Sequence, residues 1–371
     1  MTPPYRYVAA WMMATLVWAA PLYALDAVAA SNQTPRLWRL AAQEQAMLEQ
    51  RGVVLHEASL SSYLQTVAGR LWEQVSTDLN APAINVVVDT RMEAYAYPNG
   101  YFFLSTGILN QIENEDQLAM IIAHEMVHYV RQHTAVLYDH FQMSIHSTGL
   151  SYADQGQRDG GLAMKLKIDA AERQADDEGL VILKAAGYCE TEVLSLMSNL
   201  LNSMLDQGGG EAVGQLENRI KTMKSLIGQA RDSVSCTSAP VGSHVFFLNR
   251  IAPALLANAQ SALTCGDWNQ ADRSISKYLV LNPEDARAYY LQGEVLRRRN
   301  NGDGKNQCME SYKKALKIDP EFPLAHRALG ELYFKAGRFQ TAKPYFEAFL
   351  SLAPQDDARE YIKGYLRQCQ N

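Results

Sequence analysis

The sequence contains little cysteine, only five residues in a chain of 371. Five scattered cysteines are too few for a fold built on disulfide bridges. None of them has the paired spacing of a cysteine zinc knuckle, so we expect buried small side chains or one or two stabilising bridges. Because the number is odd, at least one thiol is free or pairs with another molecule. The five are Cys189, Cys236, Cys265, Cys308 and Cys369.

Neither sign of charge dominates the chain, which has 34 basic and 40 acidic side chains and a formal net charge of −6. With an isoelectric point near 5.8, this balance argues against a general nucleic-acid-binding protein. A charged fraction of 20% beside 47% apolar residues excludes a disordered chain. The length predicts two or three units, each long enough to bury a core.

Long hydrophobic runs are missing except near the N-terminus, where residues 8–25 carry no charge. This run and the small residues after it predict a signal peptide over residues 1–30, cleaved after Ala24 or Ala30. An uncleaved membrane anchor is the alternative, but 18 residues are at the lower limit for a bilayer and Pro21 would break the last turn. We therefore expect a mature protein that is exported to the periplasm.

Residues 35–250 alternate helical and short strand patterns, which predicts an α+β domain that is mostly helical with a small sheet. The dipeptide Asn99-Gly100 marks a tight turn between two of the strand candidates. The strand candidates are residues 84–88, 94–97 and 101–105.

Two long helices follow the strands. The first begins at Asn114, with Gln117 three residues later as a capping-box partner, and is predicted to extend to about residue 133. The second is predicted over residues 162–186, because Gly187 fits the cap that ends a helix. These two helices carry the residues that point to a function.

The last third of the chain, residues 252–371, has the pattern of an all-α repeat domain. Prolines that close helical segments recur at spacings of 37 and 34 residues, at Pro283, Pro320 and Pro354. Residues 326–354 best fit the tetratricopeptide repeat, a helix-turn-helix unit that buries its apolar face only when stacked. Residues 286–321 carry a longer turn, residues 252–285 are degenerate, and residues 357–370 are predicted to form a capping helix. An unrelated helical bundle is the alternative.

Histidine is also scarce, with eight residues, yet two of them form the motif His124-Glu125-Met126-Val127-His128. Four residues are close to one helical turn, so both imidazoles project from one face and can share a tetrahedral metal ion. Glu125 is placed to act as a general base toward a metal-bound water. A surface helix with two solvated histidines is the alternative, but this stretch is apolar on most sides, and buried histidines and a carboxylate need a partner.

A catalytic zinc site needs a third protein ligand, and the second helix offers one in Glu172-Arg173-Gln174-Ala175-Asp176. Glu172 and Asp176 are four residues apart and share a face. Glu172 can bind the ion while Asp176 accepts the second ring N–H of a histidine ligand and so fixes its tautomer. Without the upstream motif, this carboxylate pair would indicate only a solvated helix face.

These motifs resemble the HtpX and CAAX-prenyl-protease family of zinc peptidases. The resemblance covers most of residues 37–356. Together with the signal peptide and the repeats, the chain is similar to the periplasmic BepA-type members, proteases with chaperone-like roles in outer-membrane protein assembly and quality control. The matching positions are Ala94, Tyr97-Pro98-Asn99-Gly100, Thr106-Gly107, His124-Glu125-x-x-His128 and Glu172-x-x-Ala175-Asp176.

The resemblance implies a gluzincin-type domain with one Zn²⁺ per chain, held by His124, His128 and Glu172. Glu125 would be the catalytic base, with Asp176 beside the ligands. The stretch from His244 to Arg250 resembles the family's His-Pro-x4-Arg-Ile segment, with Val245 where proline is usual. It implies that His244 approaches the metal as a further ligand and that Arg250 lies by the active-site carboxylates. An ordinary loop histidine and a salt-bridged arginine are the alternatives.

The remaining histidines carry no metal-binding pattern. His133, His140 and His146 follow the motif at spacings that do not extend its face, so we expect them to be exposed and not to be ligands. His56 and His326 have no partner pattern.

The predicted reaction is hydrolysis of peptide bonds, with zinc polarising the scissile carbonyl and Glu125 transferring the proton to the leaving amine. The strand 101–105 is a candidate edge to which an extended protein substrate adds, and the repeats would recruit substrates or assembly partners, with peripheral association with the outer membrane or its assembly machinery. The alternative function is a chaperone or assembly-factor binding module with a latent metal site. A closed structural zinc site is disfavoured, because it would need a fourth ligand.

Overall fold

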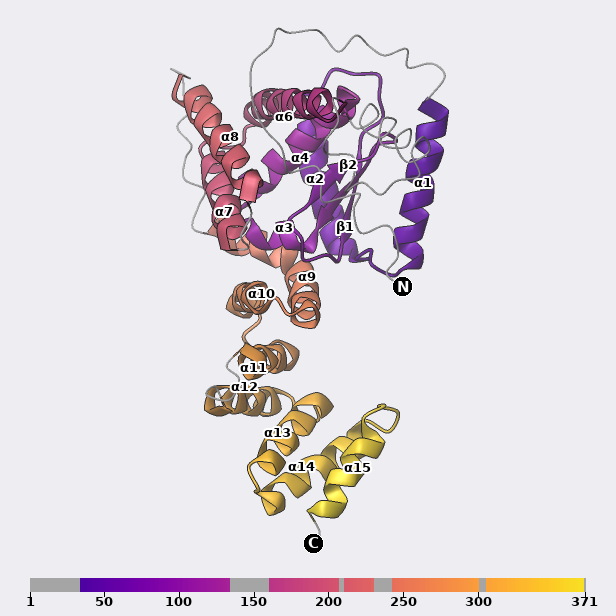
Figure 1. Cartoon of the computed structure of the whole chain (residues 1–371), viewed down its shortest axis with the longest axis vertical. Coiled ribbons are helices and arrows are strands. Elements are labelled where there is room, and N and C mark those ends of the chain that lie inside the picture. Colours follow the sequence, from indigo (N-terminus) through magenta and orange to yellow (C-terminus); the bar gives the residue numbers. More distant parts are fainter. Residues whose placement is uncertain (1–33, 134–159, 207–209, 230–241, 300–304, 370–371) are drawn as a thin grey trace. The chain divides into compact units, whose positions relative to one another are not determined.

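The computed structural model describes residues 34–133, 160–206, 210–229, 242–299 and 305–369 (Figure 1). The predicted signal peptide lies outside these residues, as do His140, His146 and Cys236. The chain divides into two compact units, residues 1–251 and residues 252–371, and helix α9 (Gly242–Cys265) crosses the boundary. None of the helices in the described ranges has the length and apolar character needed to cross a membrane.

The strands described in the first unit pair in a sheet, which consists of β1 (Ala83–Val87), β2 (Ala94–Ala96) and β3 (Tyr101–Ser105). The predicted tight turn joins β2 to β3, with Gly100 at a φ of +85° that favours glycine. β3 lies between the other two, parallel to β1 and antiparallel to β2. The prediction that residues 101–105 form an edge strand is therefore wrong, because β1 pairs with the far side of β3 and leaves β2 as an edge.

Helices cover both faces of the sheet. Successive side chains of a strand point to opposite faces. On one face, Phe103 packs in a cluster with Leu37 and Ala41 of helix α1 (Thr34–Gln50). On the other face, Phe102 contacts Tyr129 with ring centroids 5.8 Å apart. Tyr129 belongs to helix α4 (Glu115–Val130), so α1 and α4 lie on opposite sides of the sheet.

Helix α4 begins as predicted. The Asn114 Oδ1 atom accepts a hydrogen bond from the backbone N–H of Gln117 at 3.0 Å. In return, the Gln117 side chain accepts from the backbone N–H of Glu113 at 2.9 Å, so two backbone N–H groups at the start of the helix are satisfied. The end differs from the prediction: α4 stops at Val130, and Gln132 adopts a φ of +56°, which reverses the chain.

Helix α4 occupies the centre of the first unit. It contacts α2 (Ala58–Trp72), β2, α6 (Gly160–Ala185) and α7 (Glu192–Asp206). Most of its side chains are buried, which agrees with the apolar sequence around the motif. Helix α3 (Thr106–Gln111) follows β3 directly, and α8 (Gly210–Gln229) packs against α6 and α7. As predicted, Gly187 ends the region of α6 with a positive φ, of +81°.

The second unit consists of helix pairs. Within two of these pairs the helices approach closely at a glycine: a Cβ atom on Gly293 would lie 2.4 Å from the Tyr312 ring, and one on Gly330 would lie 2.6 Å from the Phe346 ring. Ile362 of helix α15 packs in one hydrophobic cluster with Tyr312 and Phe346, so this helix covers the end of the repeats, as predicted for a capping helix. The helices are α10 (Trp268–Leu281), α11 (Ala286–Arg299), α12 (Lys305–Ile318), α13 (Pro323–Lys335), α14 (Phe339–Leu352) and α15 (Arg359–Gln368).

The mostly helical first unit with its small sheet, followed by helical repeats, confirms the predicted fold class. The cysteines also agree with the expectation of at least one free thiol. Cys189 is disulfide-bonded, whereas Cys265 and Cys369 are free thiols.

Candidate metal centre

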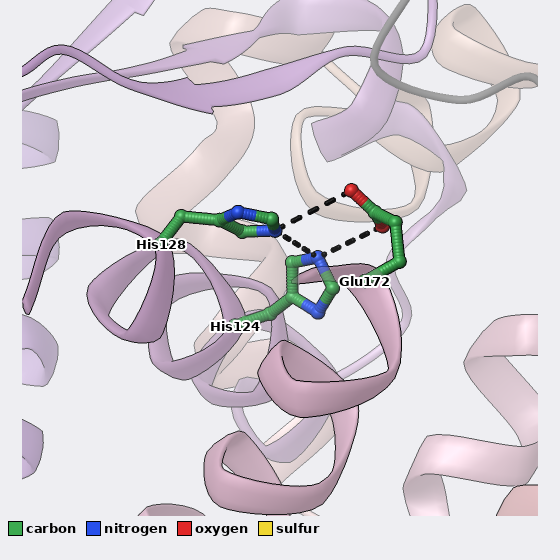
Figure 2. Close-up of side chains that lie close together, drawn as sticks. All are labelled: His124, His128 and Glu172. Carbon is green, nitrogen blue, oxygen red and sulfur yellow. Dashed lines mark hydrogen bonds and ion pairs between the residues drawn. The ribbon is translucent and has the colours of Figure 1, made fainter. Parts of the chain in front are cut away.

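Three side chains from two helices converge in the first unit: His124 and His128 from α4, and Glu172 from α6 (Figure 2). The two Nε2 atoms of the histidines are 3.1 Å apart. The His124 Nε2 atom is 3.4 Å from Glu172 Oε2, and the His128 Nε2 atom is 3.4 Å from Glu172 Oε1. The helical spacing therefore has the predicted effect, because both imidazoles lie on the face of α4 that meets α6.

The donor set fits a tetrahedral zinc ion. Zinc bonds of about 2.0–2.2 Å to nitrogen and oxygen require ligand atoms that are about 3.3–3.6 Å apart. The observed separations, 3.1 Å between the two histidine nitrogens and 3.4 Å from each nitrogen to a carboxylate oxygen, are close to this range. Two imidazoles and one carboxylate also leave one position of a tetrahedron for water, as a catalytic rather than a structural site requires.

Small residues allow α6 to approach α4 at the position of Glu172. Ala175 is fully buried, and a Cβ atom on Gly179 would lie 3.3 Å from the His124 Cα atom. Positions 172, 175, 176 and 179 lie on one face of a helix, because three- and four-residue steps return to the same side. The face that supplies the carboxylates is thus the face that the small residues bring against the histidine motif.

Asp176 and Arg219 form a charged layer behind the ligands. The Asp176 Oδ1 atom lies 3.1 Å from His124 Nδ1, so this carboxylate accepts the ring proton of His124 as the four-residue spacing predicted. Arg219 of α8 donates two hydrogen bonds to Asp176, of 2.8 and 2.6 Å. A third guanidinium nitrogen of Arg219 lies 3.1 Å from Glu172 Oε2. The single positive charge of Arg219 is therefore shared between two carboxylates and offsets part of their negative charge.

The electrostatics of the site separate its groups into charged and neutral ones. Burial alone would raise the pKa of Glu172, but the hydrogen bond from His124 and the positive charge of Arg219 lower it to about 2. Burial alone would lower the pKa of His124, yet the hydrogen bonds to Asp176 and Glu172 raise it to about 10. Burial lowers the pKa of His128 to about 3, which leaves this imidazole neutral.

Glu125 lies on the same helix with one carboxylate oxygen in use. Its side chain accepts a hydrogen bond from the backbone N–H of Ala96 on β2. Its Oε2 atom is buried and, within the described part of the chain, has no hydrogen-bond partner. Burial raises the pKa of this carboxyl group to about 7. A buried carboxylate oxygen without a partner, close enough to His124 and Glu172 for their charges to act on its pKa, is an arrangement that suits a general base.

Comparison with known proteins assigns the chain to a family. A family model described as peptidase family M48 matches residues 58–252, more than half of the chain. The chain belongs to peptidase family M48. Three models of tetratricopeptide repeats match residues 256–304, 306–337 and 323–356, which confirms the predicted repeats. The chain is thus a member of a metallopeptidase family with repeats after its peptidase region.

Two relatives resemble this M48 chain over short stretches. A stretch of 90 residues is 28% identical to the "Putative beta-barrel assembly-enhancing protease" of Vibrio cholerae serotype O1 and covers 24% of this chain and 18% of that protein. A stretch of 52 residues is 38% identical to the mitochondrial metalloendopeptidase OMA1 of Bos taurus and covers 14% of this chain and 10% of that protein. Each match thus spans less than a fifth of the relative's length.

Two residues that the sequence predicted near the metal lie elsewhere in this M48 domain. The ring of His244 hydrogen bonds to the backbone carbonyl of Glu113, just before α4 begins. The Arg250 guanidinium lies over the rings of Phe246 and Tyr63, at 4.7 and 5.9 Å from their centroids.

Both contacts lie toward the N-terminal end of α4, since Tyr63 in turn donates a hydrogen bond to Glu115 at 2.8 Å. His124 is nine residues farther along the helix than Glu115. At about 1.5 Å per residue, that is roughly 13 Å along the helix axis. The structure therefore corrects the predicted placement of His244 and Arg250, because α9 begins beside the N-terminal end of α4 instead of beside the ligands.

Two residues of the site were missed by the sequence. His133 was expected to be exposed, but it is 2% exposed and its Nδ1 atom lies 3.3 Å from His128 Nδ1. The turn at Gln132 places it there, and a helix extended to residue 133 could not. Arg219 occupies the position beside the carboxylates that was predicted for Arg250. A signal for it existed, because it shares a helix face with the buried side chains of Leu216, Ile220 and Met223.

Proposed function

We propose that this chain is a zinc-dependent endopeptidase whose single zinc ion is held by His124, His128 and Glu172. The observation that carries the proposal is the convergence of these three side chains, together with the buried Oε2 atom of Glu125, the residue next to His124, which has no partner among the described residues. When bound there, zinc supplies a Lewis acid that polarises a peptide carbonyl and acidifies water. Membership of a metallopeptidase family supports this assignment.

The residues of the chain divide the remaining work. Glu125 takes a proton at Oε2 from the attacking water and later delivers it to the leaving amine nitrogen. Its pKa of about 7, raised by burial, suits a group that must both accept and donate a proton near neutral pH. Asp176 holds the proton on Nδ1 of His124, which leaves Nε2 of that ring as a ligand atom. Arg219 keeps Glu172 and Asp176 ionised.

Strand β2 offers the edge for an extended substrate. Ser105 of β3 donates its backbone N–H to the Glu93 carbonyl, and Tyr97 donates its backbone N–H to the carbonyl of Tyr101 in β3, so the backbone groups of Glu93 and Tyr97 face β3. Because these groups alternate in direction along a strand, the backbone N–H and C=O groups of Ala94 and Ala96 point away from β3. Ala96 donates its N–H to Glu125, so this open edge adjoins the proposed base. A substrate that pairs with β2 is recognised by its extended backbone, which favours unfolded or misassembled proteins.

The remaining parts of the proposal concern location and partners. We propose that the protein acts in the periplasm on envelope proteins and that its repeats recruit substrates or assembly partners. The uncharged run at residues 8–25 supports export, and the name of the relative from Vibrio cholerae supports a link to β-barrel assembly. N-terminal sequencing of the protein from a periplasmic fraction tests the export: a start after Ala24 or Ala30 is expected, and a full-length cytoplasmic product contradicts it.

The catalytic proposal is tested with Glu125→Gln. This change removes the proton acceptor but keeps the shape of the side chain, so zinc content and folding should match the parent while casein hydrolysis falls by at least about 10²-fold. Zinc stoichiometry and casein cleavage are measured on the same preparations, with His56→Ala as the control, because His56 pairs with Glu49 at the surface. Full peptidase activity in Glu125→Gln would exclude this mechanism.

A second function, that of a chaperone or assembly-factor module with a latent metal site, is favoured by one observation. The repeats form a compact unit separate from the one that holds the metal centre. Expression of Glu125→Gln in cells that lack the parent protein distinguishes the two functions. Under the peptidase proposal the variant fails to restore envelope assembly, whereas under the chaperone alternative it restores assembly fully.

A further inference from the structure

A chain of hydrogen bonds begins on the side of His128 that faces away from Glu172. The His128 Nδ1 atom is 3.3 Å from His133 Nδ1, and His133 Nε2 is 3.2 Å from Gln174 Oε1. The Gln174 amide nitrogen donates to Glu178 Oε1 at 2.8 Å. The Glu178 Oε2 atom accepts from Arg131 Nε at 2.8 Å, so the chain ends in an ion pair at the surface.

The direction of every bond in this chain follows from its charged end. A carboxylate only accepts, so Glu178 orients the Gln174 amide with its N–H₂ outward and its oxygen toward His133. His133 must then donate from Nε2, which leaves its Nδ1 as an acceptor. The neighbouring Nδ1 of His128 therefore carries the proton. In that tautomer, the Nε2 atom of His128 has a free lone pair, and this is the atom that faces Glu172.

We infer that His133 is a positioning residue for the metal site: it holds His128 in the tautomer and ring orientation that present Nε2 to the ion. This inference deepens the proposed function and rests on it. The residue acts through His128 and contacts no metal position itself. His133 is buried, so its ring cannot exchange this contact for one with water.

The two histidine ligands are thus fixed by different groups from different directions. Asp176 of α6 accepts from Nδ1 of His124, while an imidazole that follows α4 accepts from Nδ1 of His128. The left-handed turn at Gln132 makes the second contact possible, because it folds residue 133 back onto the helix that it has just left. Groups that bind the outer nitrogen of a histidine ligand typically contribute 10–100-fold to metal affinity.

The test measures zinc affinity of the full chain by competition with a chelating indicator. We expect His133→Ala to weaken zinc binding by about 10–100-fold. His133→Asn should restore most of the affinity, because its amide oxygen falls where the ring has Nδ1. His133→Gln carries its amide oxygen near the Nε2 position and should restore little. His56→Ala is the matched control for loss of a histidine and should bind zinc like the parent.

A purely structural role predicts a different result. In that case the loss of zinc affinity in each variant would follow its thermal unfolding midpoint after chelator treatment, and His133→Asn would bind zinc no better than His133→Gln. That outcome overturns the inference. Parental affinity in His133→Ala overturns it as well. If the parent binds zinc no more tightly than His124→Ala does, the proposed function fails and the inference fails with it. Weak binding by His133→Ala with rescue by His133→Asn supports the inference even if the Ala variant is less stable.

Discussion

At the scale of single residues, Arg219 provides the positive charge behind the proposed metal ligands. It holds Asp176 through two hydrogen bonds and Glu172 through an ion pair. Asp176 is buried, and removing the partner of a buried charge leaves it without compensation, which costs about 3–5 kcal/mol. We therefore expect Arg219→Met to lower the free energy of unfolding of the chelator-treated protein by that amount, as measured by urea denaturation.

Arg250→Met is the matched control for this prediction. Arg250 lies over aromatic rings at the other end of α4, and a contact of this kind contributes about 0.5–1 kcal/mol at an exposed site. The variant should therefore lose little stability and keep the parental zinc affinity. Weaker zinc binding in Arg250→Met with parental binding in Arg219→Met would reverse our assignment of the two arginines.

Glu93 makes the stability of the folded protein depend on pH. Burial raises the pKa of its carboxyl group from 4.5 to about 7, although Arg91 lies 3.1 Å away. An acid with a raised pKa binds its proton more tightly in the folded state, so the stability it contributes is complete below about pH 4.5 and is lost as the pH rises to about 7. Glu93→Gln removes this loss. We expect the variant to be more stable than the parent at pH 8 by on the order of 2 kcal/mol, with little difference at pH 4.5.

Urea denaturation of both proteins at the two pH values measures this effect. Glu217→Gln is the matched control, because Glu217 is an exposed carboxylate of α8 in the same unit. The free energy of unfolding of Glu217→Gln should differ little from that of the parent, and by the same amount at both pH values. If the free energies of unfolding of Glu93→Gln and the parent differed by the same amount at both pH values, protonation of Glu93 would play no part in the stability.

The residues that sequence could place are those that depend on one helix alone. The four-residue spacings of His124 with His128 and of Glu172 with Asp176 determine a shared face before any packing is known. His133 and Arg219 depend on more than one element. The first requires the turn that follows α4, and the second requires α8 to pack against α6. Neither contact follows from the spacing of residues within a single helix.

At the scale of elements, the sequence predicts the positions of the strands along the chain better than their order in the sheet. Residues 102–105 are all buried, which is typical of a strand covered on both faces and paired on both edges. The apolar run at residues 102–104 was a signal for a central strand, yet the adjacent hairpin alone leaves either strand free to be the edge. Only the parallel pairing of β1 with β3 decides the order. Long-range pairing of this kind has no signature in a single segment.

The repeats allow a sharper prediction about close helix packing. A Cβ atom on Gly330 would lie 2.6 Å from Phe346 Cε1, whereas one on Gly364 would meet no atom within 4 Å. Overpacking typically costs about 1–3 kcal/mol, and glycine in an open helix position is about 0.5–1 kcal/mol worse than alanine. Gly330→Ala should therefore lower the unfolding midpoint of the repeats, and Gly364→Ala should raise it. Calorimetry of the full chain measures both, and equal midpoints would contradict the close packing.

At the scale of the whole molecule, the three proposed ligands lie within residues 124–172 and therefore in one of the two compact units. A ligand that binds only the folded state stabilises the unit that holds it, by about 2.7 kcal/mol at a free concentration of 100 times Kd. Chain connectivity alone does not pass this stabilisation to the second unit, although α9 crosses the boundary. The structure thus predicts two unfolding transitions that respond differently to zinc.

Differential scanning calorimetry with zinc and with a chelator tests this prediction. We expect zinc to raise the midpoint of the peptidase unit and to leave that of the repeats unchanged. His124→Ala should abolish the shift, and Gly330→Ala should lower only the transition that zinc does not move, which assigns each transition to its unit. If zinc raised both midpoints together in the parent and in Gly330→Ala, the units would unfold as one, and an activity of the repeats separable from the metal centre would be excluded.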